Sequence, residues 1–355
     1  MKKKNNIIIE NLSQTKGKKN ILRNINLNIP FRKLLCIVGP SGCGKTSLLR
    51  SIAGLDDFQK GKIYYNDLLL NKPGFSIPTE KRNFGLMFQE SNLFPHLNVF
   101  QNVSFGLKSK NFKDIQKKTF DILKIIGLPH FANVYPDKLS SGQKQLVSLA
   151  RSLVPKPKLL MMDEPFANLD QRLKNKIRDI TLHILQKTQT TAIIVTHDPE
   201  EAMFMGDLIA VINKGEIIQV DTPDNIYKKP KDSFVARFFG ESFSVKTTVK
   251  NSIANTIFGK LVYPKFKDQT EVEIVFRSES FNISTSKKIK KNMIKGKIIS
   301  IKPIGQSTML HLDVGNKNFS KHIHIKHFGK FIPPKNKICY ININNKHTFV
   351  FKFKK

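Results

Sequence analysis

The chain has 355 residues, of which 40% are hydrophobic and 25% are charged, as in ordinary globular proteins. This apolar content excludes disorder throughout, and an odd set of 3 cysteines without a C-x-x-C pair argues against a disulfide scaffold and a structural zinc site. No apolar run approaches the roughly 18 residues of a membrane-spanning helix. The net charge of +33 fits either compositional bias with weak surface attraction or a specific polyanion-binding role.

The first 240 residues alternate between short apolar runs and helical segments. Strands separated by helices predict an α/β fold with a mostly parallel sheet and helices on both faces. In chain order, the expected elements are a strand at 34–38, a helix at 46–53, strands at 85–88, 159–162 and 192–195, and a hairpin of 208–211 with 216–220. Residues 90–150 carry no strong strand pattern, so a helical subdomain is expected there.

After residue 240 the sequence changes to alternating runs rich in Asn, Lys, Ile, Phe and Thr. Examples are 271–276, 296–301 and 308–314. Period-two alternation between turns predicts an all-β domain. We therefore expect two domains, at 1–240 and 241–355, with a boundary near Gly240.

Residues 39–46 read Gly-Pro-Ser-Gly-Cys-Gly-Lys-Thr, the pattern G-x-x-x-x-G-K-[ST] between a strand and a helix. Glycines let backbone N–H groups curl around phosphate oxygens, and the helix N-terminus adds a positive dipole end. Lys45 can reach the β- and γ-phosphates, and the Thr46 hydroxyl can bind Mg²⁺. The expected ATP-binding residues are Gly39, Pro40, Ser41, Gly42, Cys43, Gly44, Lys45, Thr46 and Ser47.

Cys43 lies inside this loop, beside Lys45 and a helix N-terminus. Both neighbours are expected to lower the pKa of its thiol. Two interpretations stay open. Cys43 is either an inert spacer or a reactive thiol whose alkylation blocks nucleotide binding.

Two acids, Asp163 and Glu164, follow the apolar strand expected at 159–162. Ligands of parallel sheets bind beyond the carboxyl ends of the strands. Asp163 is therefore placed to hold Mg²⁺, and Glu164 is placed to polarise a water for attack on the γ-phosphate.

Residues 139–143 read Leu-Ser-Ser-Gly-Gln, which resembles the LSGGQ signature of ABC transporter ATP-binding subunits. Further motifs follow the family's order: a Q-loop at Gln89, a D-loop at 167–170 and a switch histidine at His197. Together they cover residues 1–240. Residues 78–106 resemble the importer branch that serves ferric iron, spermidine/putrescine, sulfate and maltose, and the tail resembles the OB-like accessory domain of that branch.

The resemblance implies that two copies sandwich two ATP molecules, each held between the phosphate loop of one copy and the signature of the other. The residues it assigns to ATP in trans are Ser140, Ser141, Gly142, Gln143 and Asp170. The implied Mg²⁺ ligands are Thr46, Gln89 and Asp163. The implied catalytic residues are Glu164, His197 and Gln89.

The implied partners are a second copy, integral-membrane permease subunits and, indirectly, a solute-binding protein, with no specific nucleic acid. The chain would act as a peripheral subunit at the cytoplasmic face of the inner membrane. Phe94, Pro95 and Leu97 either dock the permease or form an internal core turn. Residues 196–207 and 234–241 look most like ferric-iron importers, with spermidine/putrescine and other solutes such as sulfate as alternatives.

Three positions depart from the family pattern. Ser141 replaces the first signature glycine, Leu146 replaces an arginine, and Lys16 falls near the place of an adenine-stacking aromatic residue. A soluble ABC ATPase acting on nucleic acid or ribosomes is the main rival, but such proteins usually carry two cassettes or a long coiled coil. The signature argues against a kinase or GTPase. An exporter half would usually carry a fused membrane segment.

Overall fold

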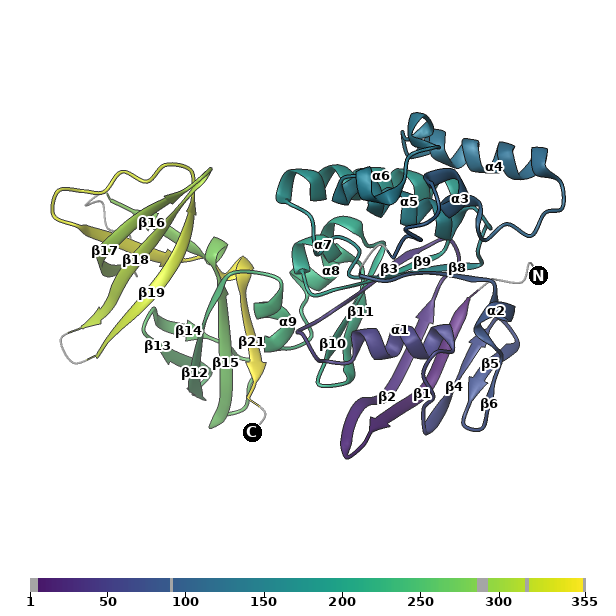
Figure 1. The fold of residues 1–355 in the computed structure, drawn as a ribbon. Coiled ribbons are helices and arrows are strands. Elements are labelled where there is room, and N and C mark those ends of the chain that lie inside the picture. Colours follow the sequence, from purple (N-terminus) through teal and green to yellow (C-terminus); the bar gives the residue numbers. More distant parts are fainter. Residues whose placement is uncertain (1–5, 90–91, 286–292, 317–318, 354–355) are drawn as a thin grey trace. The chain divides into compact units, whose positions relative to one another are not determined.

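The computed structural model describes residues 6–89, 92–285, 293–316 and 319–353. By their contacts the residues form two compact units, Met1–Pro223 and Asp224–Lys355 (Figure 1). No helix within the described ranges is both long and apolar enough to cross a membrane.

An antiparallel sheet opens the first unit, with strand order β2-β1-β4-β5-β6. Its strands are β1 (Ile7–Lys16), β2 (Lys19–Ile29), β4 (Lys60–Tyr65), β5 (Leu68–Lys72) and β6 (Phe75–Ser76). The sequence analysis did not predict this sheet. The pairing of β1 with β2 shifts register at three places, and such bulges break the alternation by which a strand is recognised.

The central sheet has the order β11-β10-β3-β9-β8-β7, and all its pairs are parallel except β10 with β11. Its strands are β3 (Leu34–Val38), β7 (Phe84–Met87), β8 (Leu159–Asp163), β9 (Ala192–Thr196), β10 (Leu208–Asn213) and β11 (Glu216–Asp221). Every residue of β3, β8 and β9 is buried, as expected for parallel strands covered on both faces. The predicted strands and the mostly parallel sheet are confirmed.

The predicted hairpin is confirmed in its turn as well as in its strands. Asn213 pairs with Glu216, so Lys214 and Gly215 form a two-residue loop. Both have positive φ, 49° and 82°, as a type I′ turn requires.

Helices cover both faces of the central sheet. The helix α1 (Lys45–Ala53) contacts β2 as well as β8 and β9, so it lies in the core between the two sheets (Figure 1). The helix α7 (Pro199–Met205) packs on β3 and β9. The remaining helices of the unit are α2 (Thr79–Arg82), α3 (Val99–Ser104), α4 (Phe112–Ile125), α5 (Ser141–Leu153) and α6 (Gln171–Thr188). Between β7 and β8 the described residues are helical without a strand, as expected for 90–150.

The second unit contains two antiparallel five-stranded sheets, ordered β14-β13-β12-β15-β21 and β16-β20-β17-β18-β19. The first consists of β12 (Ser242–Lys250), β13 (Ile253–Thr256), β14 (Gly259–Val262), β15 (Thr270–Arg277) and β21 (Thr348–Lys352). The second consists of β16 (Phe281–Ser284), β17 (Ile294–Ile304), β18 (Ser307–Asn316), β19 (Phe319–Phe328) and β20 (Ile338–Ile343). Phe276, Leu310 and Ile341 belong to one buried cluster built from both sheets. The all-β character predicted for the tail is confirmed.

Two short helices, α8 (Pro223–Lys228) and α9 (Ser233–Phe238), precede these sheets. The helix α9 packs on β15 and β21. The buried Arg277 side chain donates from Nε to the Ala236 carbonyl at 3.2 Å and from Nη1 to the Tyr227 carbonyl at 2.6 Å. By contacts the chain divides after Pro223, at the start of α8, earlier than the boundary expected near Gly240.

Candidate nucleotide site

The phosphate loop runs from the end of β3 into α1, as predicted. Gly42 and Gly44 adopt φ values of 76° and 106°, which favour glycine. A Cβ at Gly39 would lie 2.0 Å from the Ile212 carbonyl oxygen, and one at Gly44 would lie 2.8 Å from that of Ile21. The glycines thus let the loop bend while it packs directly against neighbouring backbone.

Lys45 lies within this loop, with only 5% of its surface exposed. Its Nζ donates hydrogen bonds to the carbonyl oxygens of Gly39 at 2.9 Å and Pro40 at 3.0 Å. The loop therefore holds a positive charge where a phosphate would need one.

Cys43 is buried in the core beneath the loop. Burial raises the pKa of its thiol, and this effect outweighs the opposing influence of Lys45. The expected lowered pKa is therefore wrong, because desolvation disfavours the thiolate more than the neighbouring cation favours it. The structure favours the interpretation of Cys43 as a spacer.

A hydroxyl and a carboxylate meet beside the loop. The Thr46 hydroxyl donates to Asp163 Oδ1 at 3.1 Å, and Asp163 ends the buried strand β8 with 8% of its surface exposed. Burial raises the pKa of Asp163, and the neighbouring Glu164 adds to this, while the Thr46 hydrogen bond opposes it. Such hard oxygen donors are the type that Mg²⁺ prefers.

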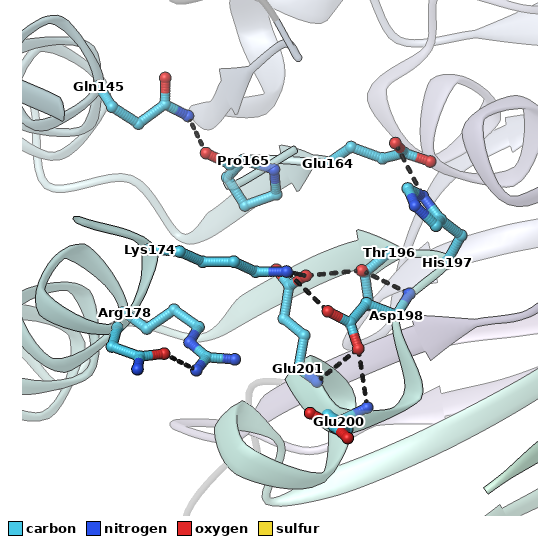
Figure 2. Close-up of polar contacts among 11 residues, drawn as sticks. Gln145, Glu164, Pro165, Lys174, Arg178, Thr196, His197, Asp198, Glu200 and Glu201 are labelled. Atoms are coloured by element: carbon cyan, nitrogen blue, oxygen red, sulfur yellow. Dashed lines mark hydrogen bonds and ion pairs between the residues drawn. The ribbon is translucent and has the colours of Figure 1, made fainter. Parts of the chain in front are cut away.

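Glu164 and His197 follow neighbouring parallel strands and lie side by side (Figure 2). The Glu164 amide donates to the Val195 carbonyl at 2.9 Å, and Glu164 has a left-handed φ of 46°. Its side chain is 21% exposed, and Oε2 lies 3.1 Å from Nδ1 of His197, whose side chain is 52% exposed. The structure thus pairs two of the predicted catalytic residues and leaves both accessible to solvent.

Gln89 lies just beyond the end of β7 and is exposed. Because β7 pairs in parallel with β8, it reaches the same edge of the sheet as Asp163.

The residues expected to act in trans stand at helix N-termini. Ser140 caps α5 in a capping box: its hydroxyl accepts from the Gln143 amide at 3.3 Å, and the Gln143 side chain accepts from the Ser140 amide at 2.8 Å. A Cβ at Gly142 would lie 2.8 Å from Leu173 Cδ1. Ser141 is exposed, and Asp170 caps α6. The signature therefore opens a helix.

The sequence analysis missed two contacts that hold this region. Gln145, buried on α5, donates from Nε2 to the carbonyl of Pro165, directly after Glu164 (Figure 2). This bond ties the signature helix to the loop after β8. Spacing along α5 offered no signal for it, because the partner is a backbone carbonyl in a different segment.

The second missed contact is a charged network behind His197 (Figure 2). Lys174 Nζ on α6 lies 2.6 Å from Asp198 Oδ2 and 3.5 Å from Glu201 Oε2. The Thr196 hydroxyl also donates to Glu201 Oε2, at 2.9 Å. Burial raises the pKa of Glu201 despite these partners. The network joins α6 to the segment that carries His197.

The segment expected to face a permease is only partly covered. The Phe94 ring is half-buried, and its centroid lies 4.5 Å from that of the exposed Phe105 ring. The buried Asn102 side chain accepts from the Phe94 amide at 2.9 Å and donates to the Leu97 carbonyl at 2.8 Å. Pro95 is exposed. The turn is thus fixed from inside while part of it faces solvent.

Comparison with known proteins places the chain in a family. Residues 22–167 match the family described as "ABC transporter". The chain is 34% identical to the Fe(3+) ions import ATP-binding protein FbpC 2 of Haemophilus influenzae, over 87% of this chain and 88% of that protein. The chain belongs to the ATP-binding subunits of ABC importers. This subunit couples ATP hydrolysis to transport.

Other relatives carry different substrate names. The chain is 35% identical to the spermidine/putrescine import ATP-binding protein PotA of Clostridium acetobutylicum, over 90% of this chain and 91% of that protein. It is 43% identical to the sulfate/thiosulfate import ATP-binding protein CysA of Neisseria meningitidis, over 66% of this chain and 67% of that protein. Among solved structures, it resembles the dimeric ATP-binding cassette MJ0796 bound to ADP and Pi, with a TM-score of 0.53 and 30% sequence identity. The match covers 61% of this chain and 98% of that chain.

Proposed function

We propose that the chain binds ATP with Mg²⁺ at the phosphate loop, hydrolyses it with Glu164 as the base, and thereby drives import of ferric iron. The main support for this chemistry is that two pairs of polar side chains lie in contact at the strand ends beside the phosphate loop. Thr46 contacts Asp163, and Glu164 contacts His197. These pairs come from α1, β8 and the residues after β9.

The residues present fit a magnesium-bound nucleotide. The loop amides and Lys45 would bind the phosphates. Thr46, Asp163 and Gln89 would hold Mg²⁺, which supplies charge neutralisation on the phosphate oxygens when bound. Two observations support the fit. The Thr46 hydroxyl already contacts the Asp163 carboxylate, and burial of that carboxylate raises its pKa, so a bound cation would stabilise its ionised form.

Glu164 would accept a proton from the attacking water. The water oxygen forms a bond to the γ-phosphorus, and the bond from that phosphorus to the bridging oxygen of ADP breaks. His197, in contact with the Glu164 carboxylate, would orient this side chain and contact the γ-phosphate. The Lys174 network would keep the His197 segment in place.

The partners follow from the same arrangement. A second copy would present the N-terminus of α5 to the bound ATP, with Ser140, Ser141, Gly142 and Gln143, together with Asp170. The dimeric state of the related cassette supports this. Phe94, Pro95 and Leu97 would dock an integral-membrane permease at the cytoplasmic face of the inner membrane, with a solute-binding protein acting indirectly.

Ferric iron is the proposed solute because residues 196–207 and 234–241 look most like that group, and an Fe(3+) import relative matches most of the chain. Spermidine/putrescine is the alternative, favoured by an equally extensive relative.

Uptake tests the proposal. Cells that carry the wild-type chain or Glu164→Gln would be offered labelled ferric iron, spermidine or sulfate. The control is His130→Gln, which replaces an exposed histidine outside the sequence motifs. We expect Glu164→Gln to lose iron uptake alone. Loss of spermidine or sulfate uptake alone would change the assigned solute and keep the mechanism. If none of the three changes, ferric iron is contradicted as the solute.

A further inference from the structure

Three histidines gather on the paired strands β18 and β19 of the second unit. Figure 1 shows where these two strands lie in that unit. His322 and His324 are separated by one residue on β19, and His311 stands directly opposite His324 on β18. Successive side chains of a strand point to opposite faces. The intervening Leu312 and Ile323 are buried, so the histidines share the solvent face of the sheet.

Their ring nitrogens converge. One ligand nitrogen from each histidine lies within 4.8 Å of the other two. The centroid of the His324 ring lies 4.2 Å from that of His311 and 4.9 Å from that of His322. With zinc–nitrogen bonds of about 2.0–2.1 Å, tetrahedral ligands stand about 3.3–3.4 Å apart. Strand pairing already holds the three backbone positions in place. Rotation of the side chains alone would therefore bring the nitrogens to the spacing of a zinc site.

The surroundings of His311 favour its neutral form, which is the form of histidine that binds metals. Partial desolvation lowers the pKa of His311, and the neighbouring His324, Lys302 and His322 lower it further. A neutral imidazole offers a free nitrogen lone pair, whereas a protonated one offers none. Lys302 opposes a bound cation, while the nearby Lys326 is engaged with Glu241 at 3.6 Å.

We propose that His311, His322 and His324 bind one divalent transition-metal ion of the zinc type. Three imidazoles suit Zn²⁺, Cu²⁺ and Ni²⁺ rather than Mg²⁺ or Ca²⁺, and they leave a fourth position for water. The site is separate from the nucleotide site and does not depend on the proposed solute. The competing account is a surface stack of histidine rings that binds no ion.

Zinc titration of the full chain tests this, with protein purified without a polyhistidine tag and without nucleotide. We expect one Zn²⁺ per wild-type chain. The variants His311→Gln, His322→Gln and His324→Gln should each weaken binding by at least about 10-fold, the loss that even outer-shell partners cause. His327→Gln is the matched control, because it lies on the same strand, on the opposite face, and should bind zinc as the wild type does.

Two readouts separate loss of the ion from loss of folding. Circular dichroism should show that all variants keep the wild-type fold, since the replaced side chains lie on the solvent face. Cobalt should give the visible absorption of a tetrahedral nitrogen site in the wild type and in His327→Gln only. Failure of the wild type to bind zinc, or full binding by a variant that combines the three histidine substitutions, would overturn the proposal.

Discussion

The two units assemble their polar side chains in different ways. In the first, Asp163 ends one parallel strand, Glu164 comes directly after it, and His197 follows the neighbouring strand, so the groups meet at the edge where the strands end. In the second, His311 and His324 lie within antiparallel strands and meet only because residues of β18 and β19 stand opposite each other. The parallel sheet thus brings together short segments from distant parts of the chain, whereas the pairing of two consecutive strands brings together histidines that are close in sequence.

This difference determines how each cluster can be disrupted. A strand-end site depends on loop glycines and on charges held behind the loop. A paired-strand site depends on register, which the buried alternate residues fix. The variants of Lys45, Lys174, Asp163 and Glu164 below probe the first kind of site, and the histidine variants above probe the second.

Lys45→Ala should give the largest loss of ATP affinity, about 100-fold. Lys45 donates to loop carbonyls that phosphate oxygens would replace as partners, and hydrogen bonds between charged groups contribute about 1.5–3 kcal/mol. Isothermal titration with ATP measures the effect. Lys118→Ala, which removes an exposed lysine on α4, is the control. Wild-type affinity in Lys45→Ala would show that the loop does not bind the phosphates.

Lys174→Met should lower the free energy of unfolding by about 2 kcal/mol, less than the 3–5 kcal/mol of fully buried pairs, because Asp198 is partly exposed. The loss arises because Glu201 keeps a buried charge without its cation. Urea unfolding measures it. The double variant with Glu201→Gln should recover part of the loss, and additive losses would show that the two side chains are uncoupled.

Asp163→Asn should stabilise the nucleotide-free protein slightly, by about 2–4 °C in Tm if the gain is about 1 kcal/mol. The raised pKa of Asp163 means that the folded chain holds this proton more tightly than the unfolded chain does. The ionised carboxylate therefore costs stability at neutral pH, and this cost fades as the pH falls towards the unfolded value of 3.8. Thermal unfolding at neutral and mildly acidic pH checks this. A lower Tm at neutral pH would contradict it.

Sequence reasoning predicted the central sheet and the phosphate loop because both are continuous segments with a local pattern. Glu164 and His197 were both expected at the catalytic centre, but their mutual contact was not predicted and is seen only in the structure. The antiparallel sheet at the N-terminus was missed because register shifts interrupt the alternation of β1. The lowered pKa expected for Cys43 was wrong because its burial in the folded core could not be foreseen from neighbours in sequence.

The histidine cluster was missed for a different reason. The sequence analysis judged metal binding from cysteine spacing, and His311 stands outside any short motif with His322 and His324. Only the register of β18 against β19 places the three together. The contact of Gln145 with the Pro165 carbonyl was also missed. Its acceptor is a backbone oxygen, which every residue carries, so no residue type in the sequence marks it.

ATP turnover by the assembled transport complex tests the central claim most directly, with the wild-type chain compared with Glu164→Gln. We expect the variant to bind ATP with wild-type affinity while turnover falls by about 100- to 10,000-fold, the usual contribution of a general base. ATP-bound dimers should accumulate as a result. Turnover at the wild-type rate would contradict the assignment of Glu164 as the base of this site.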